Sequence, residues 1–221
     1  MNRGRWMMLA PMLMIAPPAT VATGRPLGPS EPVGALPAPG TYTLDPPHTF
    51  IYFAARHLLV GTVRGRFDRM TGTIVVAKNL ADCAVDVTID AASLSTQNSM
   101  RDEDLRSPAY FAADSFPTAT YRGRGIRPSG AGWVMDGSLT IHGASKVVPL
   151  TFTFGGKAPT EVNKPSRVAF HASASAQRAD FRMTRDLLSE LGPRPSGPDV
   201  WLEIDAEALS AVGPGPSTGQ K

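Results

Sequence analysis

Residues 83–90, with the sequence CAVDVTID, alternate between apolar side chains and small or polar ones. Val85, Val87 and Ile89 share one parity, and Asp86 and Asp90 share the other. A period of two is that of a β-strand whose side chains point alternately to a core and to solvent. The segment therefore predicts a strand with one buried face.

The same alternation recurs along the chain, at residues 51–56, 138–142, 150–154, 170–175 and 200–205, and less clearly at 42–44, 63–76 and 118–122. The chain also holds 21 glycines and 21 prolines, which favour short strands joined by turns. About eight or nine such strands predict an all-β protein, either a closed antiparallel barrel or a sandwich.

Two segments break this pattern. Residues 99–111 mix apolar side chains with a dense group of charges, and we expect a short helix with Ser99 as its N-cap and Asp102 in its first turn. Pro108 would end that helix. Residues 181–198 hold three leucines and then a proline- and glycine-rich run, which predicts a short helix followed by a loop.

The N-terminal residues have the features of an export signal. Arg3 and Arg5 precede an apolar run from Trp6 to Ile15, and small residues follow up to Ala22. The run is shorter than the roughly 20 residues that span a bilayer, so we expect a cleaved signal over 1–22, with a retained anchor as the alternative. We then expect a linker over 23–39, the folded domain over 40–211 and a disordered tail over 212–221. The predicted location is outside the cytoplasm, without stable membrane insertion once the signal is removed.

Charge and cysteine content narrow the function classes. The formal net charge is +3 without a dense Lys/Arg cluster, so we expect no nucleic-acid partner. Cys83 is the one cysteine and has the inward parity of its strand, so we expect neither an internal disulfide nor a reactive thiol.

The histidines do not form a metal-binding motif. His48, His57, His142 and His171 are far apart in sequence, so we expect no metal and no other cofactor. A Gly-x-Ser-x-Gly elbow is also absent from the sequence. We therefore expect no catalytic residues, with a barrel hydrolase or isomerase that uses His48, His57 or Asp180 as the alternative.

Several motifs together resemble the YceI-like family of polyisoprenoid-binding proteins over about residues 41–208. They are Tyr42-Thr-Leu-Asp-Pro-Pro-His48, Arg101-Asp-Glu-Asp-Leu-Arg-Ser107, Leu139-Thr-Ile-His-Gly143 and Arg178-Ala-Asp-Phe181. The resemblance implies an extended, eight-stranded lipocalin-like barrel, exported to the periplasm, that holds a long isoprenoid chain such as a prenylated quinone precursor. It implies neither catalytic residues nor a metal. The family often has glycine after the Asp-Phe pair, where this chain has Arg182.

We therefore expect a carrier for a polyisoprenoid or similar long-chain amphiphile. The inward parity gives the candidates for the barrel lining, which are Phe53, Phe67, Val87, Ile89, Phe111, Phe116, Leu139, Ile141, Phe152 and Phe170. The candidates for the mouth or cap are Arg101, Asp102, Leu105, Arg178 and Asp180, with Arg178 or Asp180 pairing with the charges of residues 101–106. A solid structural barrel without a ligand remains the third hypothesis, and a homodimer remains open.

Overall fold

The computed structural model describes residues 34–57, 61–159, 164–183 and 200–211. The predicted export signal, the linker up to residue 33 and the C-terminal tail lie outside these residues. Residues 184–199, which include most of the second irregular segment, also lie outside them. The predictions made for these segments stay predictions.

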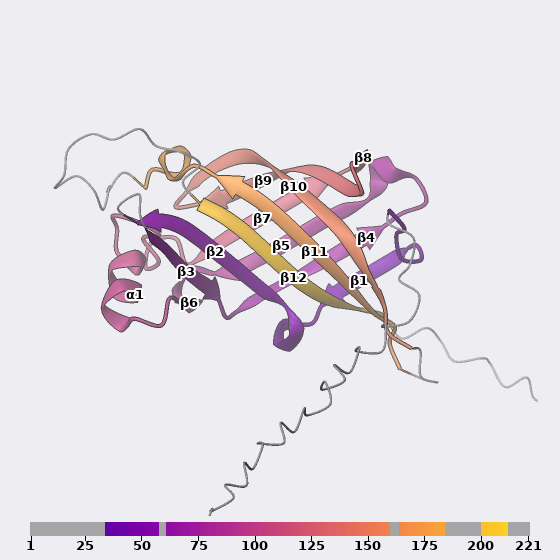
Figure 1. The fold of residues 1–221 in the computed structure, drawn as a ribbon, viewed down its shortest axis with the longest axis horizontal. Helices are drawn as coiled ribbons and strands as arrows, with labels where there is room; N and C mark the ends of the chain where they lie inside the picture. Colours follow the sequence, from indigo (N-terminus) through magenta and orange to yellow (C-terminus); the bar gives the residue numbers. More distant parts are fainter. Residues whose placement is uncertain (1–33, 58–60, 160–163, 184–199, 212–221) are drawn as a thin grey trace, which may run out of the picture.

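Eight antiparallel strands form a closed barrel, as predicted (Figure 1). In spatial order they are β1 (Gly40–Leu44), β4 (Met70–Val76), β5 (Ala84–Asp90), β7 (Thr118–Arg124), β9 (Gly132–Ile141), β10 (Ala144–Lys157), β11 (Arg167–Ala176) and β12 (Val200–Ser210). Pairing between β1 and β12, from Tyr42↔Ser210 to Leu44↔Ala208, closes the ring. Closure removes the free strand edges that an open sheet would expose.

Further strands extend the wall at one end of the barrel. The N-terminal half of β12 pairs with β2 (Phe50–His57), which pairs with β3 (Gly61–Phe67), and β3 pairs with β6 (Leu94–Ser95). A short strand, β8 (Arg127–Ser129), pairs with β9. The weak strand pattern at 63–76 therefore belongs to two strands, β3 and β4, because Asp68 and Arg69 form a connection between them.

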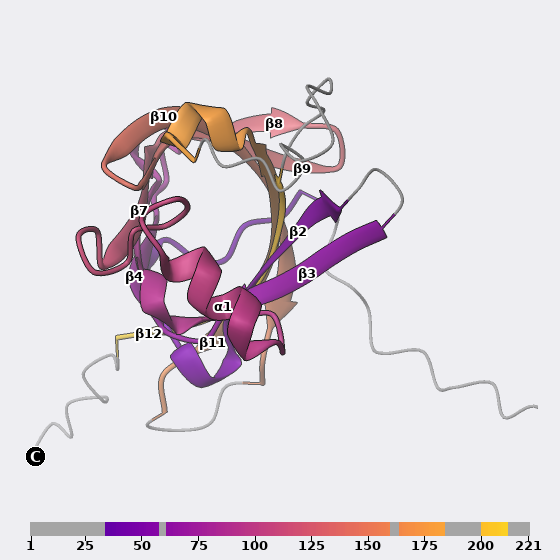
Figure 2. The same ribbon diagram turned by 90° about the vertical axis from the view of Figure 1, so that its left-hand side faces the viewer.

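Four short 3-10 turns and one α-helix join the strands within the described residues. The turns are η1 (Pro46–His48), η2 (Leu80–Asp82), η3 (Ala91–Ser93) and η4 (Arg178–Phe181), and the helix is α1 (Ser99–Arg106). Figure 2 looks into the barrel from the end where α1, η4 and the tips of β2 and β3 lie. None of the helices in this part of the chain has the length and hydropathy needed to cross a membrane.

Helix α1 differs from its prediction at its first residue. Asn98, not Ser99, is the N-cap, and its side chain accepts a hydrogen bond from the backbone N–H of Arg101. Asparagine is among the strongest N-caps because its carbonyl oxygen satisfies an otherwise unpaired N–H. The helix ends at Arg106, with Ser107 as its C-cap directly before Pro108, as expected.

The predicted alternation is confirmed in the barrel wall. Leu139 is buried and Phe152 faces the core, while their neighbours Ser138 and Thr151 are exposed. Inward residues make three apolar clusters, which include Met135, Phe170 and Leu94 respectively. Members of these clusters line the cavities described next.

Candidate functional site

The barrel encloses an apolar cavity, called here the inner compartment, of about 140 Å³. Its lining comes from every strand of the closed ring. Five of the ten predicted lining residues contribute to it, namely Val87, Ile89, Leu139, Phe152 and Phe170. These five side chains therefore lie on the inward faces of their strands, where strand parity predicts them.

Among the described residues, three side chains with polar N, O or S–H groups line the inner compartment, and each is engaged in hydrogen bonds. The Thr49 hydroxyl lies 2.9 Å from the Asp45 carbonyl oxygen and 3.1 Å from that of Glu207. The Tyr121 hydroxyl lies 3.2 Å from the Met135 carbonyl and 3.1 Å from the Val148 carbonyl. The Cys83 thiol lies 3.4 Å from the Ala77 backbone nitrogen. The surface offered to a guest is therefore hydrocarbon.

Tyr121 keeps its proton at neutral pH. Burial in the barrel is the main cause that raises the pKa of Tyr121 to about 12. A general base needs a pKa near the working pH. The phenol is therefore a structural donor from β7 toward carbonyls of β9 and β10, the next two strands of the wall.

A second cavity, called here the mouth compartment, has a volume of about 670 Å³ and adjoins the inner one. Both are lined by Ile51, Ile89, Leu139 and Leu202, so the two compartments are neighbours inside the barrel, and together they are called here the tunnel. The other predicted lining residues in the mouth compartment are Phe53, Phe67, Phe111 and Ile141.

Aromatic rings line one wall of the mouth compartment. Phe53 and Phe67 lie with ring centroids 5.5 Å apart, and Phe67 meets Phe111 edge-on at 5.6 Å. Offset and edge-to-face arrangements of this kind stabilise aromatic pairs. The rings belong to β2, β3 and the segment after α1, so they join these elements into one apolar wall.

Phe116 is the exception among the predicted lining residues, since it lines neither compartment. Its ring packs edge-on against His142, with centroids 5.2 Å apart. His142 and Gly143 have φ of 50° and 68° and form the two-residue turn between β9 and β10, the geometry of a tight hairpin. Phe116 follows α1 in an irregular segment, where strand parity does not apply, and it covers this turn instead.

The predicted mouth residues separate into two groups. Arg101, Leu105 and Arg178 line the mouth compartment. Asp102 does not line it. Its carboxylate is buried, and it accepts hydrogen bonds from the Thr96 backbone N–H at 2.8 Å and from the Thr96 hydroxyl at 2.5 Å. Asp180 lies 3.5 Å from Lys146 and so pairs with β10 rather than with the charges of α1.

The opposite end of the tunnel is covered by residues that precede β1. Leu36 lines the inner compartment and packs against two of the core clusters. The Trp133 indole donates a hydrogen bond to the Gly34 carbonyl at 3.1 Å, and the Tyr42 hydroxyl donates to the Ala38 carbonyl at 2.7 Å. Residues 34–39, which were expected in the linker, therefore contact the barrel.

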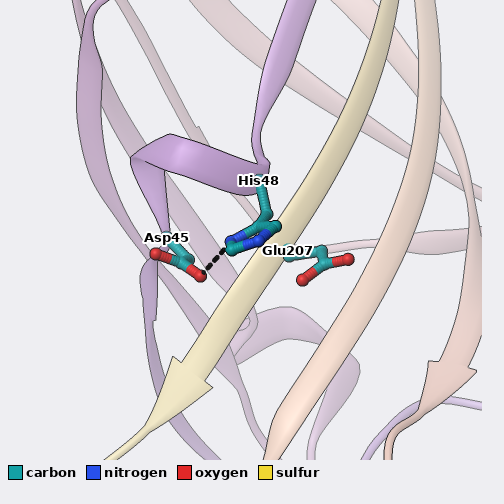
Figure 3. Close-up of side chains that lie close together, drawn as sticks. All are labelled: Asp45, His48 and Glu207. Carbon is teal, nitrogen blue, oxygen red and sulfur yellow. Dashed lines mark hydrogen bonds and ion pairs between the residues drawn. The ribbon is translucent and has the colours of Figure 1, made fainter.

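A histidine and two carboxylates meet on the barrel wall, where Asp45, His48 and Glu207 place their ligand atoms within 4.8 Å of one another (Figure 3). Arg167 Nη1 already lies 2.5 Å from Asp45 Oδ2 and 2.5 Å from Glu207 Oε2. The guanidinium thus fills the role that a cation would have between the carboxylates. Bonds from Arg167 and, less strongly, from His48 lower the pKa of Asp45. The group is an ion-pair network that joins Asp45, the residue after β1, to β11 and β12.

A second histidine–carboxylate pair lies on the outer wall, where His171 Nδ1 is 2.5 Å from Asp205 Oδ1. Both side chains are largely exposed, and neither lines the tunnel. The two residues are directly opposite on β11 and β12, so they form an ordinary cross-strand pair. The contacts of His48 with Asp45 and of His171 with Asp205 therefore lie outside the tunnel, whereas the enzymatic alternative requires such a contact inside it.

Several tunnel residues were not predicted as lining. Leu202, Ile204 and Ala174 have the inward parity of strands that the sequence did predict, so parity alone could have found them. Tyr121 lies on a strand with a weak alternation, and Met135 precedes the alternating residues 138–142 of its strand, so the sequence offered no clear signal for either.

The chain matches the family model described as the YceI-like domain over residues 42–208. A UPF0312 protein of Photorhabdus laumondii is 32% identical over 167 residues, 74% of this chain and 84% of the relative. A UPF0312 protein of Yersinia enterocolitica is 30% identical over 168 residues, 74% of this chain and 82% of the relative.

Solved structures with the same fold agree with this match. The YceI protein of Campylobacter jejuni is 28% identical, with a TM-score of 0.59 over 71% of this chain and 90% of that protein. A polyisoprenoid binding domain from Saccharophagus degradans is 17% identical, with a TM-score of 0.60 over 77% of this chain and 98% of that domain. At 17% identity the likeness concerns the fold.

Proposed function

The chain belongs to the YceI-like family, and from this membership and the geometry of its tunnel we propose that it binds and carries a long-chain apolar lipid of the polyisoprenoid class. The lipid chain lies in the tunnel, and its head group lies in the mouth compartment. The family's barrel is a binding fold, and the Saccharophagus degradans domain of the same fold is described as polyisoprenoid binding.

The observation that carries the proposal is the hydrogen bonding of the polar atoms in the inner compartment. The hydroxyls of Thr49 and Tyr121 and the thiol of Cys83 are engaged by backbone groups. Transfer of a hydrocarbon chain from water into such a lining is worth about 0.8 kcal/mol for each buried CH₂. A polar guest would have to give up its own hydrogen bonds to water there and find none in return.

The volumes of the two compartments distinguish a lipid carrier from a solid structural barrel without a ligand. The inner compartment, at about 140 Å³, is smaller than the roughly 300 Å³ at which ligand sites begin. The mouth compartment adds about 670 Å³ to the same tunnel. The combined space favours a carrier over a filled, purely structural barrel.

The direct test is to purify the protein from the organism that encodes it, extract its lipids and identify them by mass spectrometry. We expect a prenyl lipid at close to one molecule per protein. Purified protein that carries no lipid, and that binds no prenyl alcohol of any length in titrations, would refute the proposal.

Filling the inner compartment should shorten the chain that the protein accepts. Ala174 on β11 lines this compartment, so Ala174→Phe places a ring in the space proposed for the lipid tail. We expect affinity for a long prenyl alcohol to fall about tenfold or more, since several buried CH₂ groups are lost, while a short one binds nearly as before. Fluorescence competition with alcohols of increasing length measures this.

Ser173→Phe is the matched control, because Ser173 is the next residue on β11 and is exposed on the outer wall. The same ring on that side should leave the length preference unchanged. Equal effects of the two variants would place the lipid outside the tunnel.

Export is part of the proposal. It is supported by the pattern of residues 1–22, a basic start, an apolar run and small residues at its end. The intact mass of protein recovered from the cell envelope should correspond to a chain that begins near residue 23. A full-length chain in the cytosolic fraction would refute this part.

A further inference from the structure

Residues 34–39, called here the N-terminal strap, cross the end of the barrel that lies away from the mouth compartment. One hydrogen bond ties Gly34 to Trp133 of β9, and another ties Ala38 to Tyr42 of β1. In the ring of eight strands β9 is four places from β1, so the two attachments lie on opposite sides of the barrel. Figure 1 shows β1 and α1 at opposite ends, so the strap passes over the end that is remote from α1.

Leu36 lies midway between these attachments and reaches into the barrel. It is the strap residue that lines the inner compartment, and it packs against two of the core clusters. Val76, which pairs with Gly40 at the start of β1, lines the compartment at the same end. Ile89, at the other end of the β4–β5 pair, lines both compartments. The inner compartment therefore extends from the mouth compartment to the strap, where Leu36 forms part of its end wall.

The sequence of the strap restricts its conformation. Proline fixes its own φ and disfavours the helical region for the residue before it, and Leu36 and Ala38 each precede a proline. Pro37 is also buried. Gly34 has a φ of 97°, in the left-handed region that glycine adopts readily. A strap with few accessible conformations can hold Leu36 in place against a guest, whereas a flexible segment would be displaced.

We propose that Leu36 is the stop at the closed end of the tunnel and sets the longest isoprenoid chain that the protein accepts. This inference rests on the proposed function and adds the length class of the chain. The inner compartment offers about 140 Å³ to the end of the chain. Each further CH₂ that is buried tightens binding about fourfold, whereas a CH₂ that finds no room beyond the stop adds nothing. The cargo is therefore a prenyl lipid of limited length rather than a polyprenol of any length.

The test measures affinity against chain length on delipidated full-length protein, by fluorescence competition. The probes are farnesol, geranylgeraniol, the much longer solanesol and the prenyl alcohols of intermediate length. For the wild type, affinity should rise with each added isoprene unit up to a limiting length and then stop rising, because the chain end has reached Leu36.

Variants assign this limit to Leu36. Truncation of a packed leucine leaves a cavity, because the surroundings relax only partly, so Leu36→Ala should move the limit to a longer alcohol. The first alcohol beyond the wild-type limit should bind about fourfold or more tightly than it binds to the wild type. Leu36→Trp should move the limit to a shorter alcohol. Trp133→Phe removes the bond to Gly34 but keeps a ring, so it should shift the limit in the same direction as Leu36→Ala.

Leu209→Ala is the matched control. Leu209 pairs with Thr43 of β1 at the same end of the barrel and is half-buried like Leu36, but it lines neither compartment. This variant should keep the wild-type limit. An equal shift in Leu36→Ala and Leu209→Ala would mean that a loosened barrel end changes the limit, and it would overturn the inference.

The outcomes separate this inference from the proposed function. Wild-type affinity that keeps rising up to solanesol, or a limit that is unchanged in the Leu36 variants, would overturn the stop and leave the lipid tunnel standing. Should Leu36→Ala fail to fold, the limit measured for Leu36→Trp decides alone. Failure of the wild-type protein to bind any of the alcohols would overturn the proposed function and the inference together.

Discussion

Arg182 takes a backbone conformation that is uncommon for a residue with a side chain. Its φ is 60° and its ψ is 16°, in the left-handed region, and it ends the η4 turn. Its backbone N–H donates to the Ala179 carbonyl at 3.3 Å, and the next N–H, of Met183, donates to that of Arg178 at 3.2 Å. These bonds keep the turn in the shape that glycine adopts readily. Arginine at a position where the family often has glycine therefore keeps this turn and adds strain at one residue.

Replacing Arg182 with glycine should stabilise the protein. The left-handed conformation costs a residue with a Cβ roughly 1–2 kcal/mol. Glycine also has greater conformational freedom in the unfolded chain, which reduces the net stabilisation that the substitution gives. We expect the free energy of unfolding in urea to rise by about 0.5–1 kcal/mol. Arg182→Ala is the control, since alanine keeps the Cβ and should bring no such gain. An equal gain in both variants would mean that the exposed guanidinium, not the backbone, is the source of the strain.

At the scale of elements, α1 is attached to the barrel mainly by polar groups. Of its eight residues, only Asp102 is buried. Arg106 donates to the carbonyls of Ala92 at 3.0 Å and Leu94 at 2.8 Å, which fastens the end of the helix to η3 and β6. Two of the charged residues in this segment, Asp102 and Arg106, therefore attach the helix to the barrel, and the helix is not fully solvated.

Removing the Asp102 carboxylate should loosen the helix. Asp102→Ala leaves the buried N–H and hydroxyl of Thr96 without their acceptor, which costs about 1–3 kcal/mol for each unsatisfied group. We expect an unfolding free energy lower by about 2–4 kcal/mol and faster amide exchange across residues 96–107. Glu103→Ala, at an exposed position of the same helix, should change both by little. Unchanged exchange in Asp102→Ala would show that apolar contacts of Leu105 hold the helix instead.

The sequence was informative about elements wherever alternation was strong. It predicted the strands around Val87, Leu139 and Phe152 and their inward faces, because a period of two fixes which side chains share a face. It could not show that Asp102 is buried, since charge density alone does not distinguish a solvated face from a hydrogen-bonded anchor. Nor could it place Phe116, which lies outside any regular element.

For the molecule as a whole, closure of the ring depends on residues far apart in sequence. The β1–β12 pairing extends over three residue pairs, and the network of Asp45, Arg167 and Glu207 lies directly beside it. Arg167 is 122 residues from Asp45 and 40 from Glu207. Local sequence patterns do not predict contacts between residues so far apart, so the sequence alone could not reveal this network. We infer that the network compensates for the short strand pairing at the seam.

Acid should therefore weaken the seam. The bond from Arg167 holds the pKa of Asp45 below its ordinary value of 3.8. A carboxyl with a lowered pKa stabilises the fold above its unfolded-state pKa, and that contribution is lost as the pH falls through the folded-state value. Asp45→Asn should lower the unfolding free energy by about 1–2 kcal/mol at pH 7, and the difference from the wild type should shrink between about pH 5 and pH 3.

Urea unfolding at pH 7, 5 and 3 measures this convergence. Asp86→Asn is the control, because the Asp86–Arg122 pair has side chains 55% and 63% exposed, and exposed pairs contribute about 0–1 kcal/mol. That variant should follow the wild type at every pH. If Asp45→Asn stayed less stable by the same amount at pH 3 as at pH 7, the Asp45 charge would not be what holds the seam, and the closure of the barrel would rest on the backbone pairing and on the apolar contacts of Tyr42 and Ala208 alone.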